Sequence, residues 1–412
     1  MFLNLYSAIS TPDKSNIGNK LFLIGLFFLP SAFPIGSFFL LCSLFISLFR
    51  NPINIFQDRW NYIVLTSILL ILISTLKNTI IDIPLEILSY KKHLIWLNLF
   101  NWIPILIGYV GFQAYLESES QRAACSKLIV IGSFPVIFSC LLQYVFKING
   151  PFETLYGSVV WFQRPLEEVY GVTGLFNNTN YLGFWLVTLT PFIFYLINSS
   201  YKNIEKSFLA LVLFSSSAFS ILSNSRNALI GIVFIFIAYF GIKKFSLFII
   251  SLISFNFILN AFLYKSNQYF NVFLSIINNN HFDRFLSLSP RLSIWGSAID
   301  LICKKPLLGW GASTFPFLHE NLNISNFPVI INAQHTHNIF LELSHNFGIP
   351  LSIVLLIPIL MLLYKVIINL KKANHTKSIS LTKAWLIGCL IVIFFHMSDL
   401  TYYDGKISLL IC

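Results

Sequence analysis

The sequence predicts an all-α protein: a polytopic transmembrane helical bundle of about 11–12 spans, with a large outer loop that contains amphipathic helices. Three observations predict this class. The chain of 412 residues is 56% hydrophobic and only 10% charged, whereas about 25% of residues in soluble domains are charged. Its mean hydropathy is +0.75. Several apolar runs reach about 17–25 residues, which as a helix crosses about 30 Å of hydrocarbon, and they do not alternate as barrel strands do.

Apolar runs divide the chain into candidate spans. Residues 20–49 are apolar but interrupted by Pro30 and Pro34. Proline breaks a helix, so we expect two short spans joined by a tight turn. The remaining spans are expected at 60–76, 94–116, 127–146, 181–198, 207–223, 227–241, 245–264, 349–370 and 382–396. The tail 406–412 looks like the opening of a further span but is too short to cross the membrane.

The placement of basic residues predicts the orientation of the bundle. With a cytoplasmic N-terminus, the short inner loops carry more of the 27 Lys and Arg residues than the longer outer segments do. Positive charge in short loops marks the cytoplasmic side, so residues 147–180 and 265–350 face outward. We expect an N-terminal transmembrane block of about nine spans (1–264), an outer loop that carries the candidate chemistry (265–348), and a C-terminal transmembrane block (349–412).

Charge and cysteine usage exclude several classes of protein. The net charge is +11, but the basic residues lie in loops and reflect membrane orientation, so no nucleic-acid partner is expected. The six cysteines show no paired spacing, which argues against a disulfide framework or a zinc site. The first apolar run lacks the pattern of a cleavable signal peptide.

Residues 289–311 are the first candidate site. Ser289 as N-cap and Pro290 as first helical residue predict a helix that ends near Lys305. Its apolar face is expected to contain Ile294, Trp295, Ala298, Ile299 and Ile302. We expect this amphipathic helix to lie at the membrane interface, with Trp295 and Trp310 at headgroup depth.

Two arginines are candidate anion ligands. Arg291 lies in the first turn of this helix, where it can bind a phosphate, or bind lipid headgroups or a nearby carboxylate. Arg226 lies between two apolar spans with almost no loop. Such a cation costs about 2.5–3.5 kcal/mol at the centre of a span and less near the edge. It either extends to the outer headgroups or points inward to a bound anion.

Residues 335–338 are the candidate catalytic motif. Thr336 is expected to cap a helix that begins at His337, and a helix N-terminus disfavours the charged imidazolium. His337 could then stay neutral and accept a proton as a general base, although a single loop histidine is more often structural. A metal pair formed with His335 is disfavoured, because no third ligand is evident.

The outer loop before residue 181 adds polar candidates. Arg164 and Asn180 stand beside an asparagine-rich run, and asparagine offers both donors and acceptors to sugar or phosphate oxygens. Turns and a helix cap explain the same asparagines equally well.

Short motifs follow one another in order: 174–181, Ser-Arg-Asn-Ala at 225–228, Arg291 with Trp295, Pro-Leu-Leu-Gly-Trp-Gly at 306–311, and His-Thr-His-Asn at 335–338 with Gly-Ile-Pro at 348–350. Together they resemble the O-antigen ligase/O-antigen polymerase (Wzy/WaaL-like) superfamily of bacterial integral-membrane glycosyltransferases over most of the chain. Two features depart from the family pattern: Leu351 stands where Gly, Thr or Tyr is usual, and the last span is short.

The resemblance implies an enzyme that transfers or polymerises an undecaprenyl-pyrophosphate-linked glycan at the periplasmic face of the bacterial inner membrane. Its acceptor would be a glycan or lipid A-core, and membrane lipids would surround it. By motif match, His337 is the base, and Arg226 and Arg291 hold the pyrophosphate. We add His335, Asn338, Arg164 and Asn180 as candidate substrate contacts. Bidentate Arg–phosphate contacts neutralise a leaving diphosphate without a metal, so no cofactor is expected.

Two other classes of function remain open. A transporter for a small anion, such as inorganic carbon, or for a lipid-linked sugar would place ionisable groups near the middle of the membrane on broken helices. In this sequence the charges cluster at the outer edge, which favours the enzyme. A non-catalytic subunit of an envelope polysaccharide machine is the third class.

Overall fold

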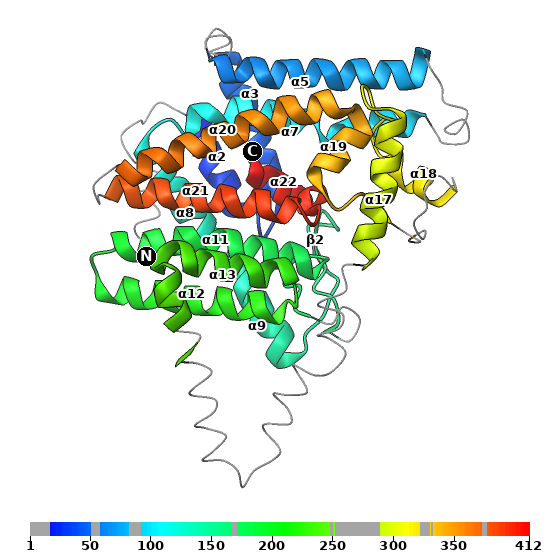
Figure 1. Cartoon of the computed structure of the whole chain (residues 1–412). Helices are drawn as coiled ribbons and strands as arrows, with labels where there is room; N and C mark the ends of the chain where they lie inside the picture. The colour runs from blue at the N-terminus through cyan, green and yellow to red at the C-terminus, as the bar shows by residue number, and fades with distance from the viewer. Residues whose placement is uncertain are drawn as a thin grey trace.

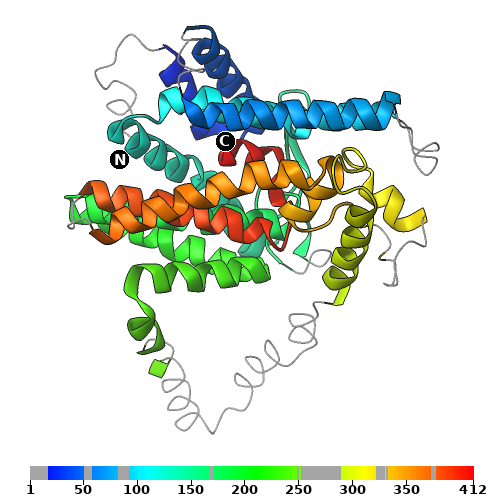
Figure 2. The same cartoon turned by 45° about the horizontal axis from the view of Figure 1, so that its top comes forward.

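The structure, a computed structural model, is a bundle in which the long helices run alongside one another (Figures 1 and 2). It describes residues 17–50, 58–81, 92–166, 171–247, 250–251, 289–321, 330, 333–372 and 377–412. The first half contains α2 (Ile17–Phe28), α3 (Phe33–Arg50), α5 (Arg59–Leu76), η1 (Lys77–Ile81), α6 (His93–Leu97), η3 (Asn98–Asn101), α7 (Ile103–Phe112), η4 (Gln113–Tyr115), α8 (Glu119–Gly132) and α9 (Phe134–Phe146).

The second half begins with a short hairpin and continues as helices. Its elements are β1 (Phe152–Thr154), β2 (Val159–Trp161), α11 (Thr179–Ser199), α12 (Asn203–Leu222), α13 (Arg226–Phe240), α17 (Ser289–Lys304), α18 (Phe315–Asn321), α19 (Ile339–Phe347), α20 (Ile349–Lys372), α21 (Lys377–His396), η5 (Thr401–Tyr403) and α22 (Gly405–Ile411). β1 and β2 pair antiparallel, with Phe152 opposite Trp161.

The predicted all-α polytopic class is confirmed. Within the described residues, six helical stretches are long and apolar enough to cross a membrane: Arg59–Ile80, His93–Tyr115, Glu119–Phe146, Thr179–Ser199, Asn203–Leu222 and Ile349–Leu370. Shorter apolar helices are Ile17–Phe28, Phe33–Phe49, Arg226–Phe240 and Ser380–His396. The predicted span at 245–264 lies mostly outside the described residues, as does the 265–288 part of the outer loop.

α11 forms the centre of the bundle and contacts α8, α12, α13 and α21. Its apolar residues are buried around most of its circumference, which is the expected environment of a helix that is hydrophobic on all sides. Trp185 is fully buried, and its indole N–H donates to Ser133 Oγ at 2.8 Å. α11 is therefore a fixed support for the residues at its ends.

Prolines and caps divide two of the predicted spans. The pair Pro30 and Pro34 separates α2 from α3 as expected. The predicted span at 94–116 is broken into α6, η3, α7 and η4, with a proline in the first turn of α7. The span at 127–146 begins earlier, at Glu119, because Ser118 forms a capping box there, and a proline starts α9 after Ser133.

The predicted helix at 290–305 is present as α17. Ile294, Ala298 and Ile302 of its predicted apolar face are buried, as is Leu301, whereas Ile299 is exposed. Trp310 is 3% exposed, because it packs beside Leu301 and donates to its carbonyl oxygen at 2.8 Å. α17 packs against α19 and thereby fixes the outer loop to the bundle.

The motif at 306–311 is joined to the end of α19 and the start of α20 by backbone contacts. The N–H of Trp310 donates to the His345 carbonyl at 2.8 Å, and the N–H of Ile349 donates to the Pro306 carbonyl at 2.8 Å. Gly348 has φ +96°, and a Cβ placed there would lie 2.1 Å from the Leu307 carbonyl oxygen. Only glycine combines this conformation with so close an approach.

The C-terminal segment forms the short helix α22 against α3 and α7. Asp404 caps it. Lys406 Nζ donates to the Leu175 carbonyl at 2.9 Å and lies 4.5 Å from the centre of the Phe176 ring. α22 is thus attached to the loop that precedes α11.

Candidate functional site

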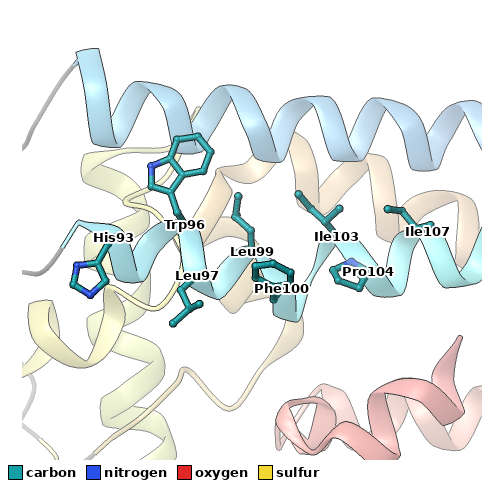
Figure 3. A pocket seen from close by; sticks show the side chains of 8 residues that line it. All are labelled: His93, Trp96, Leu97, Leu99, Phe100, Ile103, Pro104 and Ile107. Atoms are coloured by element: carbon teal, nitrogen blue, oxygen red, sulfur yellow. The ribbon is translucent and has the colours of Figure 1, made fainter. Parts of the chain in front are cut away.

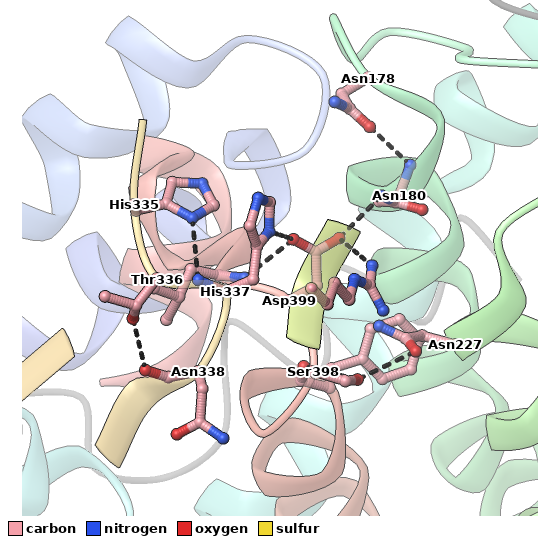
Figure 4. Close-up of polar contacts among 12 residues, drawn as sticks. Asn178, Asn180, Asn227, His335, Thr336, His337, Asn338, Ser398 and Asp399 are labelled. Carbon is pink, nitrogen blue, oxygen red and sulfur yellow. Dashed lines mark hydrogen bonds and ion pairs between the residues drawn. The ribbon is translucent and has the colours of Figure 1, made fainter. Parts of the chain in front are cut away.

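The ends of several long helices meet at one place. Asn180 lies in the first turn of α11, Arg226 begins α13, and Asp399 follows the C-terminus of α21. His337 lies in the loop before α19, and this loop reaches the same place (Figure 4). The site is therefore assembled from segments that are far apart in the sequence and that the bundle holds together.

His337 and Asp399 form the central pair of the site. His337 Nδ1 lies 3.0 Å from Asp399 Oδ1, and the side chains are 28% and 7% exposed, respectively. The same carboxylate accepts a hydrogen bond from Asn180 Nδ2 at 2.7 Å (Figure 4) and another from the N–H of Leu400 at 2.9 Å. A carboxylate with three fixed partners has one orientation, so the imidazole it binds is oriented as well.

The electrostatics of the site favour an ionised Asp399. Burial raises the pKa of this carboxyl group, but the hydrogen bond and the charge of His337, with the charge of Arg291, outweigh burial and leave the pKa lowered. When Nδ1 of His337 carries the proton, it donates to Asp399, and Nε2 is then the nitrogen that can accept another proton.

The two arginines predicted from the sequence lie close together. Arg291 Nη2 is 3.9 Å from Asp399 Oδ2, and the guanidinium of Arg226 is near enough to feel the charge of Arg291. The start of α13 is held beside Asp399, because Ser398 Oγ donates to Asn227 Oδ1 at 3.0 Å. Two like charges held together are stabilised by an anion between them.

His335 lies edge-on to His337 and stacks against the ring of Tyr403. Its ring centre is 4.2 Å from that of His337 and 5.5 Å from that of Tyr403. Burial, followed by the charge of His337, lowers the pKa of His335 to about 4. His335 is therefore neutral at pH 7, and its uncharged ring lies against that of His337.

A buried carboxylate, Glu342, lies behind His335. It is 1% exposed and accepts hydrogen bonds from the Thr336 N–H at 2.9 Å, the Thr336 hydroxyl at 3.0 Å, the Tyr403 hydroxyl at 2.7 Å and Asn346 Nδ2 at 3.1 Å. Burial, followed by the charge of Glu342, holds the pKa of Tyr403 well above its usual value, so Tyr403 remains a donor.

The structure corrects the predicted start of the helix after His337. α19 begins at Ile339, and its N-cap is Asn338 rather than Thr336, because the Asn338 side-chain oxygen accepts from the N–H groups of Phe340 and Leu341. His337 therefore precedes the helix, with a positive φ of 54°. The expected influence of a helix N-terminus on His337 is replaced by direct contact with Asp399.

The remaining candidates take different positions. Asn180 contacts Asp399, as described above. Asn338 uses both ends of its amide inside the protein, since Nδ2 also donates to the Met397 carbonyl at 2.9 Å. Arg164 is exposed, and its hydrogen bonds run through its backbone to Gln143 and Thr173. Of the predicted residues, Arg226, Arg291, His335, His337 and Asn180 are thus brought together.

Sequence reasoning missed Asp399, Glu342 and Tyr403. A usable signal was present for Asp399, because this carboxylate directly follows an apolar run at 382–396, and ionisable groups at such positions require a partner. Glu342 carried no such signal, since its first-turn position in a helix is ordinary for an acidic residue. Among the described residues, no group of three or more His, Cys, Asp or Glu side chains is arranged to hold a metal ion.

A separate cavity of about 710 Å³ lies along α6, η3 and α7. Its lining is almost entirely apolar (Figure 3): His93, Trp96, Leu97, Leu99, Phe100, Ile103, Pro104 and Ile107. It lacks the convergent polar groups that fix a reacting substrate, so the His337–Asp399 pair remains the candidate site for chemistry.

The fold and the site define a multi-pass membrane protein with a histidine–aspartate pair and two arginines at the ends of its helices. Residues 209–356 match the family model described as O-Antigen ligase. The match confirms the resemblance to the Wzy/WaaL-like superfamily that the motifs predicted. It includes Arg226, Arg291 and His337, whereas Asn180 and Asp399 lie outside the matched range. A search of curated proteins gave no match.

This match supports a membrane glycosyltransferase or ligase as the kind of enzyme, with a lipid-linked glycan and an acceptor as its substrates in general.

Proposed function

We propose that the protein transfers or polymerises an undecaprenyl-pyrophosphate-linked glycan at the periplasmic face of the bacterial inner membrane. The observation that carries the proposal is the contact between His337 Nδ1 and Asp399 Oδ1, made beside Arg291. A base with a fixed tautomer next to a cationic pair matches what glycosyl transfer from a diphosphate requires.

In the proposed reaction, His337 is the general base and Asp399 orients it. Asp399 accepts the Nδ1 proton, and Nε2 takes the proton from the acceptor hydroxyl as its oxygen forms a bond to the anomeric carbon. The bond between that carbon and the diphosphate oxygen breaks, and the lipid diphosphate leaves with its electron pair. Attack from the face opposite the leaving group inverts the anomeric configuration.

Arg226 and Arg291 are proposed to bind the diphosphate. Their mutual repulsion falls when an anion lies between them, and guanidinium groups bind phosphate oxygens in a bidentate manner. The charge that develops on the leaving group is then stabilised by preorganised donors. This role needs no metal ion.

The helix ends support the proposed orientation. α11 and α13 begin at the site, and α21 ends there. Lysines follow the other ends of α11 and α13, at Lys202, Lys206, Lys243 and Lys244. Because positive charge in short loops favours the cytoplasm, the site is proposed to face the periplasm.

The test is transfer in proteoliposomes loaded with undecaprenyl-pyrophosphate-linked glycan and an acceptor. We expect His337→Ala and Arg291→Ala to abolish transfer, and Arg59→Ala, at the start of α5, to leave it unchanged. Wild-type turnover in either site variant would refute the assignment. Glycan analysis of a deletion strain separates the two activities: loss of all polymer from lipid A-core indicates a ligase, and single-repeat caps indicate a polymerase.

The position of the charges also bears on the transporter alternative. A transporter places ionisable groups near mid-membrane on broken helices, whereas Arg226, Arg291, His337 and Asp399 all lie at helix ends or beyond them. This placement supports the enzyme. Unchanged glycan in the deletion strain would support the transporter.

A further inference from the structure

Glu342 joins the two chain segments that carry the catalytic pair. On one side it holds Thr336, the residue directly before His337, through the backbone N–H and the hydroxyl. On the other side it accepts from the hydroxyl of Tyr403, in the segment that follows Asp399. One carboxylate therefore bridges the loop that contains His337 and the segment that contains Asp399.

Four donor groups surround the Glu342 carboxylate, and one of them, the Thr336 hydroxyl, also lies 3.0 Å from the Asn338 carbonyl oxygen. A carboxylate has about four lone-pair positions, and two donors lie within 3.0 Å of Oε2 and two within 3.1 Å of Oε1. Because the side chain is also 1% exposed, Glu342 neither reaches a substrate nor accepts its proton. Its effect on the reaction has to pass through the segments it holds.

The conformation of His337 shows why such a bridge is needed. Its φ of +54° is unfavourable for a residue with a side chain, and it persists only where the surroundings impose it. Glu342 fixes Thr336 before His337, and the Asn338 cap, bonded to the Met397 carbonyl, fixes the backbone after it. With both neighbours held, the imidazole is directed at Asp399.

We infer that Glu342 is a positioning residue that keeps His337 Nδ1 against Asp399 by clamping Thr336 and Tyr403 together. The inference rests on the proposed function only for its kinetic consequence. The contact between His337 and Asp399 can be observed without any reaction.

Variants at Thr336 and Tyr403 remove one side of the bridge at a time. Thr336→Val removes a hydroxyl that Thr336→Ser keeps, and Tyr403→Phe removes the other hydroxyl. Glu342→Gln keeps the shape of Glu342 but places an amide N–H₂ opposite groups that are themselves donors. We expect Glu342→Gln to lower kcat about 100-fold, the scale of a misplacement of about 1 Å, with the KM for the lipid-linked donor unchanged within about twofold.

If Glu342 clamps Thr336 and Tyr403 together, the effects of variants at Thr336 and Tyr403 should depend on Glu342. If the contacts are unrelated, these effects should be independent of Glu342. In the wild-type background, Thr336→Val and Tyr403→Phe should each lower kcat about tenfold, while Thr336→Ser stays near wild type. In the Glu342→Gln background, the Gln amide keeps one acceptor oxygen and so can hold at most one side of the bridge. The further loss of kcat on adding Thr336→Val or Tyr403→Phe should then be smaller than in the wild-type background. Full additivity in that background would overturn the inference.

A spectroscopic readout separates positioning from a purely structural role. In full-length protein labelled with ¹⁵N-histidine, with the His337 signal assigned by His337→Asn, the wild type should show one tautomer with the proton on Nδ1. Glu342→Gln should show a mixture of tautomers at an unchanged content of folded protein. If Glu342→Gln lowers thermal stability but keeps both the single tautomer and the kcat per folded molecule, Glu342 is structural only and the inference fails.

Failure of the proposed function would look different. A wild-type protein that transfers no glycan, yet loses its single His337 tautomer in Glu342→Gln, would contradict the enzyme assignment and retain the clamp. An active enzyme whose tautomer and kcat are insensitive to Glu342→Gln would contradict the clamp alone.

Discussion

Asp399 Oδ1 lies 3.0 Å from His337 Nδ1, although the two residues belong to segments separated by α19, α20 and α21. The same carboxylate binds Asn180 at the start of α11. Asp399 therefore links three parts of the bundle, and we expect changes at this residue to affect activity.

Replacing Asp399 by Asn tests the orientation of the imidazole. The Asn amide can donate to Nδ1, which favours the tautomer with its proton on Nε2 and removes the proposed base. We expect kcat to fall about 100-fold or more, with the KM for the donor little changed, in the proteoliposome assay. Asp300→Asn on α17 is the matched control, and an Asp399→Asn enzyme within about threefold of that control would contradict the orienting role.

Replacing Arg291 by Lys tests diphosphate binding. Lysine keeps the charge but loses the planar, bidentate geometry, so we expect the KM for the donor to rise about tenfold. In Arg291→Ala, where no turnover is expected, donor binding measured without turnover should be weaker still. Arg226→Gln should weaken donor binding, because it removes one of the two guanidinium groups proposed to hold the diphosphate. Donor affinity unaffected by all three variants would show that the diphosphate binds elsewhere.

Gly348→Ala tests the joint between the 306–311 motif and α20. The new Cβ would meet the Leu307 carbonyl oxygen at 2.1 Å in a backbone with φ +96°, so we expect a loss of about 1–3 kcal/mol in stability, measured as a lower thermal midpoint in detergent. Gly388→Ala on α21 is the control: its Cβ makes ordinary contact with Phe192 at 3.4 Å, and alanine favours a helix. Equal thermal midpoints for Gly348→Ala and Gly388→Ala would contradict the close approach of Gly348 to Leu307.

His335 predicts a pH dependence of stability. Its folded pKa, lowered to about 4, lies below the ordinary value of about 6.5, so the unfolded chain binds a proton more readily than the folded one. Stability from this residue should be constant above about pH 6.5 and fall between about pH 6.5 and 4. Asp399, whose pKa is also lowered, adds a loss at more acidic pH.

The measurement is the thermal midpoint of wild type and His335→Gln from pH 8 to pH 4. Gln cannot titrate, so the variant should lose less stability than wild type between about pH 6.5 and 4. Parallel curves over that interval would show that His335 is not the group responsible.

Much of the architecture could be predicted from the composition and from the positions of the prolines. The apolar runs identified the helices, and Pro30 with Pro34 identified the α2–α3 turn, because proline acts locally and independently of the rest of the fold. The division of 94–116 into four pieces was not anticipated, since the exposure of each helical face depends on neighbours that only the tertiary structure supplies.

The site was partly predictable for a similar reason. Arg226, Arg291 and His337 are ionisable residues beside apolar or turn-rich segments, so the sequence alone identifies them as candidates. Thr336 was a reasonable cap by residue type, but Asn338 took that role because the chain turns at His337 with a positive φ. Pairing of His337 with Asp399 depends on how α19 and α21 pack, which no local pattern specifies.

The connection of Asn180, His337 and Asp399 also has a consequence for biogenesis. During insertion, Asn180 emerges with α11 and Asp399 only after α21. Ribosome-bound chains that stop before α21 therefore contain His337 but not Asp399. Newly made protein should therefore pass through a long inert interval and become active in a single late step, when the segment after α21 leaves the translocon.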